Sequence, residues 1–97
     1  MTTISLQNNQ WHITGEILMD NANKVLIESN ALEMANDLQV DFSAVTDVDT
    51  AALSLLIEWQ RRAMASNKKI VFKHLPESLR SLATLYGVAD FIPLSTN

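Results

Sequence analysis

Hydrophobic and polar residues alternate along the first 18 residues, as they do in β-strands that bury one face. Residues 3–6 alternate weakly, and residues 11–18 alternate more clearly. The polar residues 7–9 between them have the composition of a tight turn, so we expect a β-hairpin here. Gly15 marks either a bulge or the end of the second strand.

Helical and strand patterns alternate along the rest of the chain. We expect helices over residues 23–36 and 51–65 and from Pro76 to a stop at Gly87, strands over 39–43 and 69–74, and a loop over 46–50. The resulting order is β-β-α-β-α-β-α. Strands that alternate with helices pair in parallel through crossover connections, whereas the opening hairpin is antiparallel. We therefore expect residues 1–97 to form one domain, a small α/β sandwich with a mixed, mostly parallel sheet and helices mainly on one face.

The helix expected over residues 51–65 has apolar residues on two sides. At 100° per residue the core stripe consists of Leu53, Ile57, Gln60 and Met64, with Leu56 and Ala63 at its edge. Leu55 lies nearly opposite this stripe, among Ala51, Ala52, Trp59 and Arg62. A smooth apolar surface with an aromatic anchor is typical of a protein interface. In the alternative interpretation Trp59 folds over the sheet edge and the exposure of Leu55 is incidental.

Two short motifs around this helix resemble the signature of STAS domains, the family named after sulfate transporters and anti-sigma-factor antagonists. The motifs are Asp41-Phe42-Ser43 at the end of a strand and Asp49-Thr50-Ala51-Ala52-Leu53 at the start of the helix. The family pattern has glycine where this chain has Ala52. The order of elements and the chain length are also similar, so the resemblance covers nearly the whole chain and implies a STAS-like sandwich.

Within that family, residues 48–50 and 82–88 resemble the small STAS subunits of bacterial phospholipid ABC transporters. The resemblance implies a non-enzymatic cytoplasmic protein that binds the transporter's ATPase subunit, in a membrane complex that also holds the permease. It would lie at the inner membrane only through that partner. The implied partner-binding residues are Asp49, Thr50, Ala51, Ala52, Leu55, Trp59 and Arg62.

Thr50 also matches the residue that a kinase modifies in phosphorylation-controlled STAS proteins. The alternative function is therefore an anti-sigma-factor antagonist that phosphorylation at Thr50 switches. Phosphate would add a charge of about −1.5 to −2 beside Asp47 and Asp49. For a transporter subunit we favour Thr50 as an unmodified contact residue, and its simplest role is that of a helix cap.

The overall charge limits the classes of partner. Seven Lys and Arg residues against eleven Asp and Glu residues give a net charge of −4, which disfavours binding to nucleic acids and to anionic membranes. No apolar run approaches the ~18 residues that a membrane span needs. The first ten residues lack the basic start and apolar run of a signal peptide, so we expect a cytoplasmic protein.

Residues that could support enzymatic or cofactor chemistry are few. With no cysteine, disulfides, Cys-based zinc sites and a thiol nucleophile are excluded. Asp41, Asp47 and Asp49 lack the spacing of a calcium loop and suit capping better. His12 and His74 accompany no catalytic motif, and no glycine-rich loop could hold a phosphate. We therefore expect no enzyme activity, no metal and no cofactor.

Overall fold

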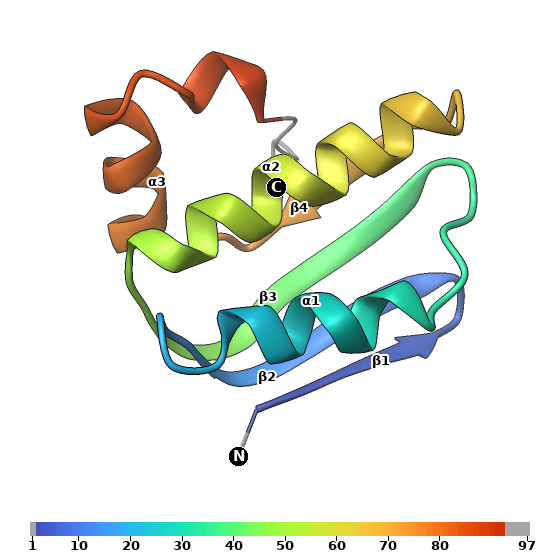
Figure 1. The fold of residues 1–97 in the computed structure, drawn as a ribbon, viewed down its shortest axis with the longest axis horizontal. Coiled ribbons are helices and arrows are strands. Elements are labelled where there is room, and N and C mark those ends of the chain that lie inside the picture. Colours follow the sequence, from blue (N-terminus) through green and yellow to red (C-terminus); the bar gives the residue numbers. More distant parts are fainter. Residues whose placement is uncertain (1, 93–97) are drawn as a thin grey trace.

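The computed structural model describes residues 2–92, which form one mixed sheet covered by helices (Figure 1). Along the chain the elements are β1 (Thr3–Gln7), β2 (Gln10–Ile17), α1 (Ala22–Asn30), β3 (Leu38–Val48), α2 (Thr50–Ala65), β4 (Ile70–Lys73), α3 (Glu77–Leu85) and the 3-10 turn η1 (Ala89–Phe91). The strands lie side by side in the order β1-β2-β3-β4. β1 and β2 are antiparallel and the other two pairs are parallel, so the predicted order and the mixed sheet are confirmed.

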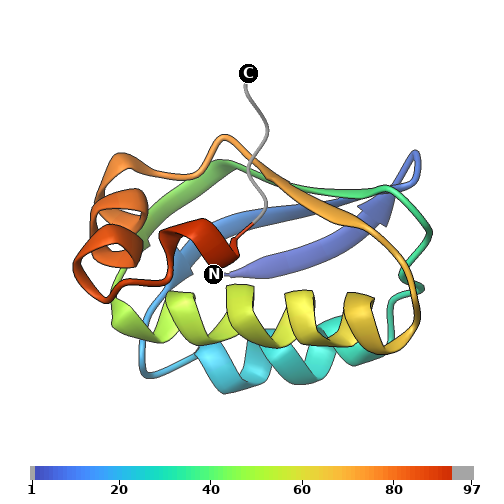
Figure 2. The same cartoon turned by 90° about the horizontal axis from the view of Figure 1, so that it is seen from above.

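The helices cover one face of the sheet. α1 and α2 lie side by side across it, and α3 lies near the beginning of α2 (Figures 1 and 2). No helix of residues 2–92 covers the opposite face. Strand β3 reflects this arrangement, because Leu38, Val40 and Phe42 are buried beneath the helices while Gln39 and Asp41 between them are half-buried on the open face.

The predicted hairpin is confirmed. Its turn consists of Asn8 and Asn9, which both have positive φ angles, 51° and 65°. Two consecutive residues in this region define the mirror-image turn that matches the twist of paired strands, and asparagine tolerates it better than most residues. The register of β2 against β3 shifts between Gly15 and Glu16, where β3 has Thr46 as an extra residue. Gly15 therefore lies opposite a bulge of β3 and is not the end of β2, which continues to Ile17.

Strand β3 is longer than predicted. It runs through the segment expected to be a loop and stops at Val48, directly before α2. β2 pairs with it along this length, as far as Ile17 opposite Val48. The turn-forming side chains of residues 46–50 suggested a loop, but the backbone partner offered by β2 keeps Thr46 and Asp47 extended.

Helix α1 is shorter than predicted, because it ends at Asn30 rather than at residue 36. The next carbonyl groups accept hydrogen bonds from distant side chains instead of continuing the helix. Arg62 donates to the Leu32 oxygen at 2.7 Å and Lys68 to the Met34 oxygen at 2.7 Å. These contacts come from the other end of α2 and from the loop after it, so the local pattern could not reveal them.

The predicted orientation of α2 is wrong. Leu55 and Trp59, expected on a free surface, are only 2% and 1% exposed. The buried residues of this helix are Ala52, Leu53, Leu55, Leu56, Trp59 and Ala63, whereas Met64 of the predicted core stripe is exposed. The reason is that α2 packs against the sheet beneath it and also against α1 and α3.

Trp59 is a central residue of the core. Its ring lies edge-on to Trp11, with centroids 5.6 Å apart, and its Nε1–H donates to the hydroxyl of Ser29 at 2.9 Å. Ser29 belongs to α1 and is fully buried. Because buried indole and hydroxyl groups are costly without partners, this hydrogen bond fixes the packing of α1 against α2.

Glycine ends α3 as predicted. Gly87 has a φ of +72°, and the N–H groups of Gly87 and Val88 return to the carbonyls of Thr84 and Ala83. The helix begins at Glu77, with Pro76 as its cap. Tyr86, which follows the last residue of α3, is 60% exposed.

Candidate partner-binding site

Asp49 connects the start of α2 to the loop between β2 and α1. One carboxylate oxygen accepts the N–H of Ala51 at 2.8 Å, which caps the helix. The other accepts the N–H of Met19 at 2.9 Å. The Asp49 backbone N–H donates to the Ile17 carbonyl at 3.3 Å. Asp49 therefore positions the Met19 loop beside Thr50, the first residue of the helix.

Replacing Asp49 with alanine is expected to destabilise the domain by about 1–2 kcal/mol, because both N–H acceptors are lost. Urea unfolding measures the loss, and faster hydrogen exchange at the Met19 amide reports the loosened loop. Asp47→Ala is the matched control, since within residues 2–92 the Asp47 carboxylate accepts only its neighbour's N–H, that of Val48. Equal losses in the two variants would contradict the positioning role of Asp49.

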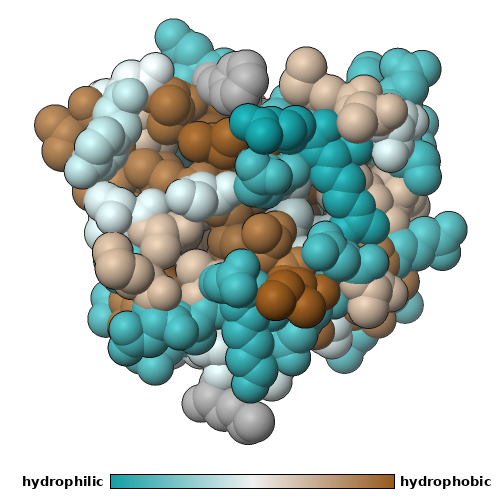
Figure 3. Space-filling model, viewed as in Figure 1, coloured by the Kyte–Doolittle hydropathy of each residue, from teal (hydrophilic) through white to brown (hydrophobic). Residues whose placement is uncertain are grey.

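A groove of about 480 Å³ runs beside the first turns of α2. It is lined by Met19, Thr50, Ala51, Leu53, Ser54, Ile57, Tyr86 and Val88. These residues come from the loop before α1, from α2, and from the end of α3 and the residues after it. On the helix-bearing side of the molecule, hydrophobic residues gather over α3 and the adjoining part of α2 (Figure 3).

A second hollow of about 260 Å³ lies on the other side of α2, against α1. Met19, Ala51 and Ser54 line both hollows, so they form a low ridge between them. We use the term Thr50 surface for the six residues on and around this ridge: Met19, Thr50, Ala51, Ser54, Ile57 and Tyr86. The two apolar hollows beside the small side chains of Ala51 and Ser54 can hold larger side chains of a partner.

The residues predicted from sequence divide into two groups. Thr50 and Ala51 line the groove, and Asp49 holds its rim in place. Ala52 and Trp59 are buried in the core, and Leu55 reaches only the floor of the smaller hollow. These three are not an exposed surface, and that expectation is wrong.

Arg62, the last of the predicted contact residues, is engaged within the fold. Its guanidinium donates to the carbonyls of Ser29 and Leu32 at 2.9 and 2.7 Å, and it lies 5.5 Å from the centre of a Trp11 ring. These contacts hold the end of α1 against α2. Arg62 is therefore a structural residue rather than a free cation of the docking surface.

Met19 and Tyr86 are members of the Thr50 surface that sequence reasoning missed. Met19 is an exposed apolar residue in a strand-to-helix loop, and Tyr86 directly precedes the glycine that ends α3. Apolar residues in such loop positions are a weak signal of a surface role. Their shared location depends on how α3 and the Met19 loop approach α2.

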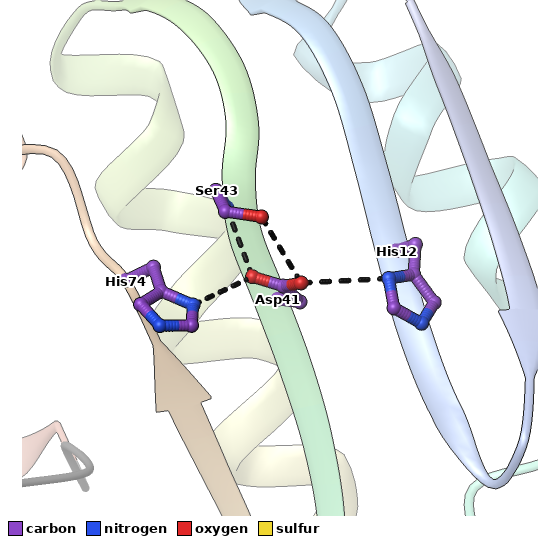
Figure 4. Close-up of polar contacts among 4 residues, drawn as sticks. All are labelled: His12, Asp41, Ser43 and His74. Atoms are coloured by element: carbon purple, nitrogen blue, oxygen red, sulfur yellow. Dashed lines mark hydrogen bonds and ion pairs between the residues drawn. The ribbon is translucent and has the colours of Figure 1, made fainter. Parts of the chain in front are cut away.

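A polar cluster on the open face of the sheet surrounds Asp41 (Figure 4). His74 Nδ1 lies 3.0 Å from one carboxylate oxygen and His12 Nδ1 3.5 Å from the other. The N–H and hydroxyl of Ser43 donate to the same carboxylate at 2.9 and 3.1 Å. Ser43 of the Asp41-Phe42-Ser43 motif therefore completes the shell of an aspartate whose side chain is only 15% exposed. Within residues 2–92, no group of three or more His, Cys, Asp or Glu residues is placed to hold a metal ion.

The stability of the domain is expected to depend on Asp41 in acid. Burial alone raises the pKa of Asp41, but hydrogen bonds from His74 and Ser43 and the charge of His74 outweigh it and lower the pKa below the ordinary 3.8. A carboxylate with a lowered pKa stabilises the fold above its unfolded-state pKa, and the effect disappears as the pH falls through the folded-state value. At pH 7 Asp41→Asn should cost about 1 kcal/mol, a loss that shrinks below pH 4.

Urea unfolding at pH 7 and pH 3 tests this dependence, with Asp47→Asn on the same strand as the control. A loss for Asp41→Asn that is the same at both pH values would contradict it.

Comparison with solved structures places the fold in a known class. The unphosphorylated anti-sigma factor antagonist SpoIIAA matches with a TM-score of 0.68 and 10% identity, over 100% of this chain and 89% of that one. A Thermotoga maritima protein assigned as an anti-sigma factor antagonist matches with a TM-score of 0.77 and 11% identity, over 99% and 86%. The phosphorylated form of the Bacillus cell fate determinant SpoIIAA gives 0.65 and 11%, over 100% and 93%. These likenesses define the STAS-type α/β fold.

The family model described as "Mlab, STAS domain" matches residues 2–94. The chain therefore belongs to the MlaB-like STAS domain family. No curated protein sequence matches it. Among residues 2–92, no helix has the length and apolar character needed to cross a membrane.

Proposed function

We propose that this chain is a non-enzymatic STAS subunit of an ABC transporter, and that it binds the transporter's ATPase subunit through the Thr50 surface. The observation that carries the proposal is the match of residues 2–94 to the MlaB-like family, with a groove at the residues where the family motif opens α2. The role resembles that of MlaB with its ATPase partner MlaF. The transporter would move phospholipids and maintain the lipid asymmetry of the outer membrane.

The Thr50 surface supports this role through its shape and composition. Thr50, Ala51 and Ser54 are small, so the backbone of α2 is open to close approach. Met19 and Tyr86, the two largest exposed residues of this surface, supply apolar and aromatic contact area. The subunit would act by binding, remain in the cytoplasm, and reach the inner membrane only through the ATPase and the permease.

Recovery of the chain's partner from cells tests the proposal. An affinity-tagged copy, expressed in its own organism, is expected to copurify with an ABC ATPase and its permease, identified by mass spectrometry. A variant with Ser54→Arg, which places a large charged side chain on the ridge between the two hollows, should lose both proteins. Arg61→Glu, an exposed change two turns further along α2, should keep them. Recovery of a kinase-type anti-sigma factor in place of the ATPase would contradict the proposal.

The alternative function is an anti-sigma-factor antagonist controlled by phosphorylation at Thr50. It is favoured by the fold similarity to SpoIIAA and by the exposed position of Thr50 at the start of α2. A phosphate there would gain about 0.3–1 kcal/mol from the helix dipole. However, Asp49 already occupies the Ala51 N–H that the phosphate would use, and its negative charge opposes a second anion.

Intact mass analysis of the chain purified from cells separates the two functions. A transporter subunit is expected to show the unmodified mass. A phosphorylated fraction that maps to Thr50 and disappears in Thr50→Val would support the antagonist instead.

A further inference from the structure

The hollow between α1 and α2 is lined mainly by apolar residues and by one charged residue. Its volume is about 260 Å³, and it lies where the two helices run side by side (Figures 1 and 2). The apolar residues come from the Met19 loop and from the facing sides of both helices; they are Met19, Ala22, Leu26, Ala51 and Leu55. Among residues 2–92, Glu58 is the only charged residue of the lining. The hollow therefore combines apolar contact area with a single carboxylate.

The ion pair that Glu58 forms within the chain is exposed. Arg61 Nη1 lies 3.3 Å from Glu58 Oε1, about one helical turn further along α2. The Arg61 side chain is 72% exposed and that of Glu58 45%. Such a pair contributes little to stability, because water screens the two charges and two long side chains lose freedom when they pair. A cation from outside the chain can therefore take the place of Arg61 with little loss of stability.

Hydrogen bonds hold the Met19 side of the hollow in place. Asn21 binds both backbone groups of Leu18, because its N–H donates to the Leu18 carbonyl at 3.0 Å and its Oδ1 accepts the Leu18 N–H at 2.8 Å. The turn between these two residues carries Met19, whose own N–H donates to the Asp49 carboxylate at 2.9 Å. These contacts order the turn before any partner binds. A partner that contacts Met19 therefore has less conformational freedom to remove on binding.

Acidic residues dominate the part of the sequence that forms the hollow. Residues 1–60 contain nine Asp and Glu residues and one basic residue, Lys24. Lys24 is exposed on α1, two positions away from both Ala22 and Leu26, so it lies on the other side of that helix from the hollow. Residues 93–97 contain no Lys or Arg, so they cannot supply a basic side chain to Glu58. This distribution of charge favours a cationic group that comes from a partner.

We propose that this hollow binds a lysine or arginine side chain of the transporter's ATPase subunit. Both side chains carry their charge on a flexible aliphatic stem that packs against apolar surface while the charged end stays accessible. The stem lies against Leu26 and Leu55, and the charged end pairs with Glu58 in place of Arg61. The hollow thus supplies the two contacts that a long basic side chain needs.

The inference rests on the function proposed for the Thr50 surface, because Met19, Ala51 and Ser54 line this hollow as well as the larger groove. It adds the chemistry that the partner must present. The groove beside Thr50 takes an apolar side chain, and the hollow on the other side of the ridge takes a basic one. A partner that lacks either side chain is expected to bind weakly, so the pair of hollows gives the surface its specificity.

Calorimetric titration of the full 97-residue chain with the ABC ATPase that copurifies with it tests the inference. Glu58→Gln is expected to weaken the affinity about tenfold. Arg61→Gln is expected to strengthen it about threefold, because the competing cation is removed. Glu28→Gln makes the same chemical change as Glu58→Gln at an exposed position of α1 and should bind as the unchanged chain does. Added salt should weaken the binding of the unchanged chain more than that of Glu58→Gln.

Charge exchange identifies the residue of the partner. Glu58→Lys should weaken binding about a hundredfold, and glutamate in place of one lysine or arginine of the ATPase should restore it. Three results would overturn the inference while the ATPase still binds, so that the proposed function stands: no loss with Glu58→Gln, equal losses with Glu58→Gln and Arg61→Gln, or failure of every exchange to restore binding. An unchanged chain that binds no ABC ATPase would overturn both. A dimer of the chain alone that Glu58→Gln dissociates, measured by sedimentation, would place a second copy in the hollow and overturn the inference.

Discussion

Replacing Leu55 with aspartate is expected to unfold the domain. Leu55 is 2% exposed and belongs to the core between α2 and α1. The substitution removes a buried apolar side chain and places a carboxylate among the apolar residues of the core. Together these effects exceed about 4 kcal/mol, which is comparable with the whole stability of a domain of this size. The variant should lack a cooperative thermal transition by circular dichroism.

Ser54→Asp is the matched control for this experiment. Ser54 precedes Leu55 on the same helix and is exposed, so the same charge should change the free energy of unfolding by less than about 0.5 kcal/mol. A folded Leu55→Asp variant with an unchanged melting temperature would place Leu55 on the surface after all. The orientation of α2, and with it the position of the Thr50 surface, would then be wrong.

Local signals in the sequence are sufficient for much of the fold. The Asn8–Asn9 turn, the cap at Asp49 and the stop at Gly87 each act within a few residues, and the structure has all three. Such features fix where elements begin and end because their hydrogen bonds are short in sequence. From these boundaries the order of elements and the mixed sheet follow.

The orientation of α2 could not be predicted in the same way, because its apolar residues occupy more than one side. Counting at 100° per residue gives two possible core faces, and the choice depends on where α1 packs. That position is fixed by Trp59 with Ser29 and by Arg62 with Leu32, contacts that span 30 residues of sequence. The early end of α1 has the same long-range cause.

Only part of the candidate site could be predicted, because the rest depends on contacts between segments that are far apart in the sequence. Thr50 and Ala51 belong to a contiguous motif, whereas Met19 and Tyr86 come from the loop before α1 and the end of α3. Only the folded arrangement brings these three segments around one groove. The buried position of Ala52 also explains why alanine is accepted where the family has glycine: its methyl group faces the core, not the partner.

Replacing Tyr86 with alanine is expected to abolish most of the binding to the proposed ATPase partner. Tyr86 is 60% exposed and lines the same groove as Thr50, so its ring is available to a partner and contributes little to the core. Tyrosine is enriched among interface residues whose loss costs 2 kcal/mol or more, about a thirtyfold loss of affinity. The free energy of unfolding should change by less than about 0.5 kcal/mol, because the position is exposed.

Leu85→Ala provides the matched comparison, because Leu85 is the adjacent residue, is 76% exposed, and does not line the groove. Calorimetric titration of the purified chain with the ATPase subunit should show full affinity for this variant and weakened affinity for Tyr86→Ala. If the partner is sensitive to Leu85 and not to Tyr86, it docks on the outer side of α3 instead. A partner insensitive to both, but lost with Ser54→Arg, would confine the contact to α2 and the Met19 loop, because Ser54 lies on the ridge between the two hollows.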